Sequence, residues 1–361
     1  MPKVSIVLPS YNGERYIGES IQSICNQTYN DWELIIVDDC STDNTLKIAK
    51  EFAEQDSRIR VVHNEKNRKL PASLNIGFSQ VNGEYLTWTS DDNLYHVNAI
   101  EIMVKYLDEH TMVPLVRSQM ELIDENGNVI QESFDFDYES FPYANNIGAC
   151  FMYRRSVLDC IGNYDESLFC VEDYDYWMRI YEKYNCIGEI SNLLYSYRVH
   201  SATLTSTKSD QVKEKLNTFR KKHFDFIVYS LKNNGVLLTC LYYEMNKFQP
   251  MTGVEKEKII KYAPWLAGQR SRKIEGSYII YGAGARGRKK AEELKGEFYC
   301  FVDMDKTKQG NKVMAKNVLS ISKAKELYPN AEYIIAADLR LVYDMIKTLE
   351  SYQIYTYIYE F

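Results

Sequence analysis

Residues 4–89 alternate between short apolar, β-branched runs and amphipathic stretches, and no other feature of the sequence constrains the fold as strongly. The apolar runs predict strands, and the stretches between them predict helices with one apolar face. We expect strands at 4–9, 33–38, 58–63 and 84–89, with helices near 17–25, 46–53 and 70–81. This alternation produces right-handed crossovers and a mostly parallel sheet flanked by helices, so the expected fold class is α/β.

Each of the four predicted strands ends in polar side chains. These ends are Pro9-Ser10-Tyr11-Asn12, Asp38-Asp39, His63-Asn64 and Asp91-Asp92. In open α/β sheets ligands bind outside the carboxyl ends of the strands, so we expect the four clusters on one edge of one sheet. Two adjacent carboxylates after a strand usually hold a cation that also grips phosphate oxygens, and a solvated acidic turn is the alternative. The shared edge favours a binding site, because packing alone does not predict it.

The next stretch predicts further elements of the same domain. We expect a helix at 96–109, a hairpin within 112–132 that turns at 125–128, and a strand at 148–155. A helix near 171–180 follows, and Glu172 and Asp173 stand in its first turn. Acids in this position are favoured by the helix dipole, so a capping role is the alternative to a chemical one.

Composition restricts the compartment and the kind of partner. The eight cysteines are dispersed without a C-x-x-C pair, which argues against zinc and disulfide frameworks and favours a reducing cytosol. Met1-Pro2-Lys3 leads directly into a strand, so we expect no signal peptide, and no apolar run of about 18 residues predicts a membrane-spanning helix. A net charge of −7 gives no reason to expect nucleic acid as a partner. The expected location is cytoplasmic.

Residues 206–273 differ in charge from the rest of the chain. Between positions 208 and 273 there are 14 basic and 6 acidic residues, a net charge of +8, around two apolar stretches at 224–231 and 236–243. A basic amphipathic region of this kind can dock on the anionic inner face of the plasma membrane. The alternative is a helical linker that packs against the preceding domain.

Residues 274–361 predict a second, smaller α/β unit. Gly282, Gly284 and Gly287 form a G-x-G-x-x-G pattern between a strand and a helix, and Asp303 ends the next strand, 21 residues after Gly282. This spacing is typical of dinucleotide-binding folds. We expect strands at 332–338 and 355–360 and a helix at 339–351. About 85 residues correspond to only half of a full dinucleotide domain, so we expect a small Rossmann-like module without a visible acid–base pair for hydride transfer.

Taken in order, the motifs of residues 3–205 resemble family 2 glycosyltransferases of the GT-A fold. They are Pro-Ser-Tyr-Asn at 9–12, Val-Asp-Asp-x-Ser-x-Asp at 37–43, Ser-Asp-Asp-Asn at 90–93, Arg-Arg-x-Val-Leu at 154–158, Gly-x-Tyr-Asp-Glu at 162–166, Glu-Asp-Tyr-Asp-x-Trp at 172–177 and Tyr-Arg-x-His at 197–200. The resemblance implies a GT-A catalytic domain at 1–205, which would be followed by the basic helical region at 206–273 and the Rossmann-like domain at 274–361.

The resemblance also implies roles for individual residues. Asp92 would be the direct ligand of Mn²⁺ or Mg²⁺, with Asp91 near the ribose or the metal. His200 would be a further ligand, and a structural histidine without a metal is the alternative. Many relatives have Asp-x-Asp where this chain has Ser-Asp-Asp, so the division of labour between Asp91 and Asp92 stays open. Asp173, with Glu172 beside it, would be the general base of an inverting displacement.

The nucleotide-sugar site implied by the family lies on the same edge. Asp39 would accept a hydrogen bond from a uracil imide, Tyr11 could stack on the base, and Lys69 or the neighbouring Arg68 could reach the diphosphate. The full set of nucleotide-sugar-binding candidates is Pro9, Tyr11, Asn12, Glu14, Asp39, Lys69, Asn75 and Asp91.

We therefore expect transfer of a sugar from a UDP-sugar to a hydroxyl of a growing surface polysaccharide or a lipid-linked glycan. The sequence is also compatible with a protein that forms a homo-oligomer. An NAD-dependent oxidoreductase that uses the C-terminal glycine pattern and a non-catalytic glycan-assembly subunit are the alternative functions. Retention of Asp91, Asp92 and Asp173 counts against the non-catalytic alternative.

Overall fold

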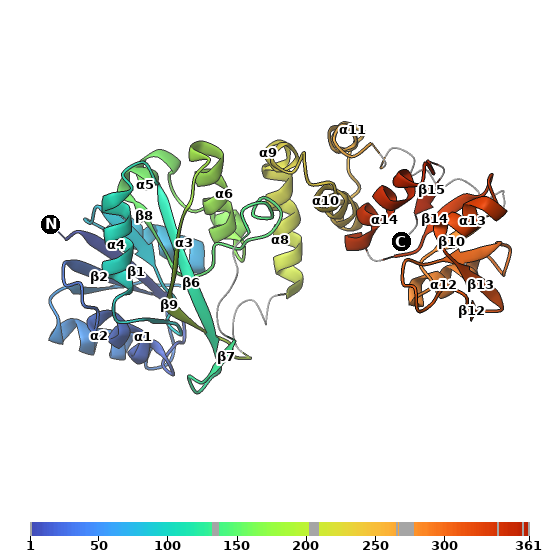
Figure 1. Ribbon diagram of the computed structural model, residues 1–361. Coiled ribbons are helices and arrows are strands. Elements are labelled where there is room, and N and C mark those ends of the chain that lie inside the picture. Colours follow the sequence, from blue (N-terminus) through green and yellow to red (C-terminus); the bar gives the residue numbers. More distant parts are fainter. Residues whose placement is uncertain are drawn as a thin grey trace. The chain divides into compact units, whose positions relative to one another are not determined.

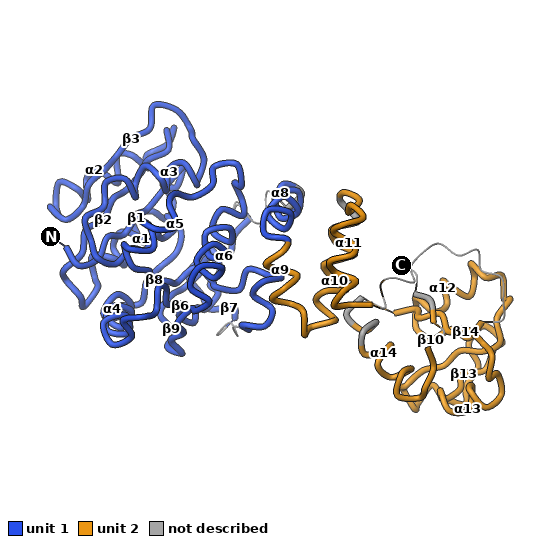
Figure 2. The backbone as a smooth tube through the Cα atoms, turned by 90° about the horizontal axis from the view of Figure 1, so that it is seen from above, with its two compact units in different colours: residues 1–224 blue, residues 225–361 orange. Residues whose placement is uncertain are grey.

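The computed structural model describes residues 2–131, 137–201, 209–264, 266, 278–337, 339–355 and 357–359. The chain divides into two compact units, Met1–Phe224 and Asp225–Phe361 (Figure 2). Among the described residues of the basic region predicted at 206–273, one helix lies in the first unit and three lie wholly or almost wholly in the second. The division into three domains stays a prediction.

The first unit is built on a sheet of nine described strands in the order β3-β2-β1-β4-β8-β6-β9-β5, with β7 beside β6 (Figure 1). Strands β1 to β4 pair in parallel, and the intervening helices connect them as the sequence predicts. The elements of this half are β1 (Val4–Ser10), α1 (Ile17–Cys25), β2 (Trp32–Asp38), α2 (Thr45–Gln55), β3 (Ile59–His63), α3 (Leu70–Phe78) and β4 (Tyr85–Trp88). The α/β fold class is confirmed.

The other half of this sheet is mixed, because β8 and β5 run antiparallel to their neighbours while β6 and β9 are parallel. The predicted hairpin is present as β6 and β7, and the helix with the two acids is α6. The elements are β5 (Leu94–Tyr95), α4 (Ala99–Glu109), β6 (Leu115–Ile123), β7 (Val129–Gln131), β8 (Phe151–Arg154), α5 (Arg155–Ile161), the 3₁₀ helix η1 (Glu166–Leu168), α6 (Glu172–Tyr184) and β9 (Gly188–Arg198).

Alternation along the strands places apolar side chains on both faces of the sheet. Val4, Ile6 and Leu8 of β1 belong to a core that includes residues of α1, α2 and α4. Val7 points to the opposite face, where α3 comes so close that a Cβ on Gly77 would lie 2.4 Å from a Val7 methyl group. Helices on both faces explain why the strand sequences are nearly all apolar.

In the described part of the chain between the two sheets there are four helices, and the apolar stretches predicted at 224–231 and 236–243 form two of them. The helices are α8 (Ser209–Lys222), α9 (Phe224–Ser230), α10 (Gly235–Phe248) and α11 (Gly253–Ile260). Across the described ranges, none of the helices combines the length and apolar character needed to cross a membrane. Arg220 of α8 is buried within the unit, and this favours packing over membrane docking for this helix.

The second unit contains a larger sheet than the sequence predicts. Its described strands have the order β12-β13-β11-β10-β14-β15, and all pairs except β12–β13 are parallel. Strands β12 and β13 were not predicted, because Lys312, Lys316 and Asn317 interrupt their few apolar residues. The elements are β10 (Tyr278–Tyr281), α12 (Ala285–Glu293), β11 (Cys300–Val302), β12 (Lys312–Val313), β13 (Lys316–Leu319), α13 (Ile321–Leu327), β14 (Glu332–Ile335), α14 (Leu339–Ser351) and β15 (Tyr357–Tyr359).

Candidate functional site

The carboxyl ends of the parallel strands bring the predicted polar clusters to one edge of the first sheet. Ser10 at the end of β1 is in register with Asp38 of β2, and Asp38 is in register with His63 of β3. His63 Nδ1 lies 2.7 Å from Asp38 Oδ2, which is fully buried. The strand ends therefore form one continuous polar rim, as the sequence predicts.

Two loops on this rim are joined by hydrogen bonds. The backbone amide of Thr42 donates to Asn12 Oδ1 at 2.8 Å, and the amide of Asn44 donates to Glu14 Oε2 at 3.0 Å. Asn12 has a positive φ of 55°, which suits asparagine better than most residues. Asn12 and Glu14 thus shape the loop that carries exposed Tyr11. Their contact with a nucleotide-sugar stays a prediction.

Asp91 faces the end of β1 rather than open solvent. Its Oδ2 accepts a short hydrogen bond from the Ser10 hydroxyl, next to Gly13. Burial and the neighbouring Asp92 carboxylate raise the pKa of Asp91 to about 7, against the opposing effect of the Ser10 hydrogen bond. The charged form of Asp91 therefore gains from any cation placed beside it.

Asp92 is held from the other side by the end of β9. Its Oδ2 lies 3.0 Å from His200 Nε2, and its backbone carbonyl accepts a hydrogen bond from Arg198 Nε at 2.9 Å. Arg198 is buried, and its Nη2 also pairs with Glu19 Oε2 at 2.7 Å. Asn93 Oδ1 accepts the Arg198 amide at 2.8 Å. The predicted ligands Asp92 and His200 are thus brought together by contacts across more than 100 residues of chain.

The side chains at this edge suit a metal ion whose remaining coordination positions are filled by oxygen atoms of the substrate. Within the described part of the chain, no group of three or more His, Cys, Asp or Glu side chains converges as a metal site. A divalent cation such as Mg²⁺ is commonly bound by one or two carboxylates together with phosphate oxygens and water. Asp92 and His200 provide one carboxylate and one imidazole at 3.0 Å, with Asp91 adjacent in sequence, so the residues suit this partial coordination.

Asp39 organises the loop between β3 and α3. It is almost completely buried, and its Oδ1 accepts hydrogen bonds from Asn64 Nδ2 and the Arg68 amide, both at 2.8 Å. Its Oδ2 accepts the Lys69 amide at 2.9 Å. Each carboxylate oxygen has two acceptor positions, so Oδ2 keeps one for a further donor such as the predicted imide. Lys69, at a φ of 72°, and Arg68 have exposed side chains.

Asn75 and Pro9 have structural contacts in addition to their predicted role. Asn75 Oδ1 accepts the Tyr164 amide at 2.8 Å and its Nδ2 donates to the Tyr164 carbonyl at 3.0 Å, so Asn75 ties α3 to the segment before η1. Pro9 is buried opposite Val37 of β2. Their participation in nucleotide-sugar binding stays a prediction.

The two acids of α6 occupy different environments. Glu172 is buried, and its Oε2 has no hydrogen-bond partner within the described residues. Burial and the adjacent Asp173 carboxylate raise the pKa of Glu172 above its ordinary range. Asp173 is half-buried, and burial raises its pKa although hydrogen bonds from the Tyr174 amide at 2.7 Å and from Asn145 Nδ2 at 2.9 Å oppose the effect. A carboxylate with a raised pKa and free acceptor positions can take a proton.

The sequence did not predict the contact of Asn145 with Asp173, nor the bonds by which Arg198 holds the loop of Asp92. Asn145 lies in a loop with no periodic signal, and its contact with Asp173 spans 28 residues. Arg198 appears in the Tyr-Arg-x-His motif, but its partner Glu19 is 179 residues away. The Tyr-Arg-x-His motif is the signal in the sequence that points to Arg198.

The glycine pattern of the second unit is shaped by packing. A Cβ on Gly287 would lie 1.7 Å from the Gly282 carbonyl oxygen, and Gly282 has a φ of 108°. Asp303 Oδ2 accepts the Ala283 amide at 2.9 Å and pairs with Lys308 Nζ at 3.2 Å. The carboxylate predicted at the ribose position is therefore already bonded to the glycine loop and to a lysine.

Comparison with known sequences identifies relatives along the first unit. Residues 5–162 match the family described as Glycosyl transferase family 2. EpsE of Bacillus subtilis is 34% identical over 206 residues, which cover 55% of this chain and 74% of EpsE. An uncharacterized glycosyltransferase of Rickettsia typhi is 33% identical over 224 residues, covering 59% of this chain and 69% of the relative.

Solved structures show the same fold at low sequence identity. Residues 1–349 of TarS from S. aureus, in complex with UDP-GlcNAc, align with a TM-score of 0.52 and 19% identity over 75% of this chain and 93% of that one. The mannosyltransferase PcManGT from Pyrobaculum calidifontis, in complex with GDP-Man and Mn²⁺, gives a TM-score of 0.53 and 16% identity over 75% of this chain and 76% of that one. With its GT-A sheet and these relatives, the chain belongs to glycosyltransferase family 2.

Proposed function

We propose that this glycosyltransferase moves a sugar from a UDP-sugar to a hydroxyl of a glycan or lipid-linked glycan acceptor, with inversion and with the help of Mn²⁺ or Mg²⁺. The observation that carries the proposal is the pairing of Asp92 Oδ2 with His200 Nε2 at 3.0 Å, on the rim that also holds Ser10, Asp39 and Asp91. The nucleotide-sugars named for TarS and PcManGT support a donor of this class.

The donor's diphosphate would lie beside Asp92 and His200. When bound there, the cation supplies Lewis-acid stabilisation of the charge that develops on the diphosphate. Asp39 accepts the backbone amides of Arg68 and Lys69 and so fixes the loop that presents these two cationic side chains. An acceptor position left on Asp39 suits the imide of uracil, and Tyr11 is exposed and available for stacking.

Asp173 would take the proton from the acceptor hydroxyl as that oxygen attacks the anomeric carbon. The hydrogen bonds from Asn145 and Tyr174 fix the orientation of the carboxylate and favour its ionised form. Burial moves the pKa of Asp173 upwards, towards the range in which a general base is effective. Glu172 adds a second buried acid beside the base, and its pKa is also raised by burial and by Asp173.

Calorimetric titration of UDP tests the proposal. UDP should bind in the presence of Mn²⁺ and bind much more weakly with a chelator. Asp92→Asn should lose the metal-dependent affinity while keeping its thermal midpoint, because the amide has the same shape without the charge. Asp159→Asn, which removes an exposed carboxylate from α5, is the matched control. Unchanged, metal-enhanced UDP affinity in Asp92→Asn would contradict the metal assignment, and tight NAD binding without UDP binding would favour an oxidoreductase.

A further inference from the structure

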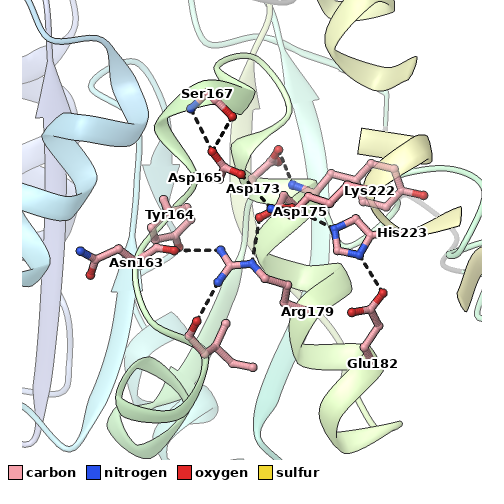
Figure 3. A network of polar contacts seen from close by, with 12 residues as sticks. Asn163, Tyr164, Asp165, Ser167, Asp173, Asp175, Arg179, Glu182, Lys222 and His223 are labelled. Carbon is pink, nitrogen blue, oxygen red and sulfur yellow. Dashed lines mark hydrogen bonds and ion pairs between the residues drawn. The ribbon is translucent and has the colours of Figure 1, made fainter. Parts of the chain in front are cut away.

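A network of charges centred on the buried Asp175 joins α6 to the end of α8, where the Lys222 side chain is 38% exposed (Figure 3). Asp175 of α6 is completely buried, and three basic side chains contact it. Its carboxylate pairs with Arg179 Nε at 2.8 Å, with Lys222 Nζ at 2.7 Å and with His223 Nε2 at 2.9 Å. The last residue of α8 and the residue after it thus meet the first turns of α6.

The same side chains extend to neighbouring segments. Lys222 Nζ also lies 2.8 Å from Asp165 Oδ2, and Asp165 Oδ1 accepts the Ser167 amide at 3.0 Å at the start of η1. The His223 ring uses its other nitrogen, Nδ1, to contact Glu182 Oε1 at 2.7 Å. A single ammonium group therefore links η1, α6 and α8.

Arg179 closes the network on the opposite side. It donates to the carbonyl of Ile161 at the end of α5 and to that of Asn163, each at 2.9 Å (Figure 3). The segment from Ile161 to Ser167 is thus held both at its beginning, by Arg179, and at Asp165, by Lys222. The first turn of α6 is fixed relative to this segment by directional contacts.

The network bears on Asp173, which lies two residues before Asp175 in the same helical turn. Asp175 points into the charge network, while Asp173 is half-buried and contacts Asn145. Any rotation or shift of the turn that breaks the contacts of Asp175 also moves the Asp173 carboxylate. Apolar side chains could hold α6 equally stably, since buried ion pairs can be replaced by apolar groups at little cost in stability. Ion pairs and hydrogen bonds differ from apolar packing because they also fix the orientation of the groups that they join.

We propose that Lys222 is a positioning residue for glycosyl transfer: its bridge between Asp165 and Asp175 holds the first turn of α6 so that Asp173 meets the acceptor hydroxyl. This inference rests on the proposed function. It gives Lys222, the last residue of α8 in the region predicted as a linker or membrane-docking segment, a role in positioning the base, while the rest of α8 has no part in the bridge. Asp175 keeps Arg179 and His223 when Lys222 is replaced, so the fold should survive the change.

The test compares three variants of the full-length protein. Lys222→Met removes the charge at similar length, Lys222→Arg keeps a cation for the bridge, and Lys221→Met removes the same charge from the neighbouring position of α8. The measurements are UDP affinity with Mn²⁺, UDP release from UDP-sugars with water as acceptor, and hydrogen–deuterium exchange of peptides covering 163–176.

Lys222→Met should release UDP about 10–100-fold more slowly, because a shift of about 1 Å in a reacting group can cost this much. UDP affinity should stay within about twofold of the unmodified protein, since the donor rim is not part of the bridge, and exchange at 163–176 should be faster. Lys222→Arg should recover most of the rate, and Lys221→Met should keep it.

Equal rates of UDP release in Lys222→Met and Lys221→Met would overturn the positioning role. A failure of the proposed function gives a different result: the unmodified protein would neither bind UDP nor release it from any UDP-sugar. In that event hydrogen–deuterium exchange still tests whether Lys222 holds the first turn of α6. Equal exchange at 163–176 in the two methionine variants would show that it does not.

Discussion

Replacing Gly13 with alanine should disturb the rim at Asp91. A Cβ at this position would lie 2.1 Å from Asp91 Oδ2 and 2.8 Å from Ser10 Oγ, far inside van der Waals contact. Either the loop or the Asp91 side chain must therefore move and break its bond with Ser10. Overpacking of this kind costs about 1–3 kcal/mol, which corresponds to about 2–12 °C in the thermal midpoint of a unit of this size.

Gly18→Ala is the matched control, because it adds the same methyl group five positions later. There the Cβ would meet only a methyl group of Ile48, at 4.0 Å, and alanine is favoured over glycine inside a helix by up to about 1 kcal/mol. Scanning calorimetry should show a lower midpoint for Gly13→Ala and an unchanged or higher one for Gly18→Ala. Titration of UDP with Mn²⁺ should show weaker binding only for Gly13→Ala. Equal midpoints and equal UDP affinities for the two variants would refute the placement of Asp91 against Ser10 and Gly13.

Two further substitutions and one binding measurement test other features of the structure. Asn145→Ala removes a hydrogen bond that favours ionised Asp173, so the acidic limb of the pH–rate profile should move up by as much as about one pH unit; an unmoved limb would contradict the contact. The folded-state pKa of Glu172 is raised by burial and by Asp173, so the protonated side chain stabilises the fold at low pH and this contribution is lost as pH rises. Glu172→Gln should therefore raise the thermal midpoint more at pH 8 than at pH 5, and the opposite order would be inconsistent with a raised pKa. A fluorescence titration with NADH should show weak or no binding, since Asp303 is bonded to the glycine loop and to Lys308, and tight binding would revive the oxidoreductase alternative.

The sequence predicts the first half of the catalytic sheet within one or two residues. Its strands are covered by helices on both faces, so they consist of continuous apolar runs with clear ends. Because parallel strands align their carboxyl ends, the chain order alone brings Ser10, Asp38 and His63 together. These parts follow from local periodicity and one topological rule.

The rest depends on contacts that are distant in sequence. Strand β9 was not predicted, because its pairing with β6 is irregular, with register shifts between Ser118 and Met120, and its burial does not alternate cleanly. The bonds of Arg198 to Glu19 and of Asn145 to Asp173 join segments that no periodic pattern connects. The bridge of Lys222 to Asp165 and Asp175 could not be predicted either, because the sequence indicates only a basic helical region here and gives no sign that α8 contacts α6.

UDP release from a panel of UDP-sugars, with Mn²⁺, with Mg²⁺ and with a chelator, measures whether this chain is a metal-dependent glycosyltransferase. We expect release from at least one UDP-sugar, dependence on the divalent cation, and loss of about 10²–10³ in rate for Asp92→Asn. Asp173→Asn should still bind UDP with unchanged affinity but lose transfer. Absence of binding and cleavage for every UDP-sugar would contradict the proposed function, and equally fast release in the chelator and in Asp92→Asn would contradict the metal site.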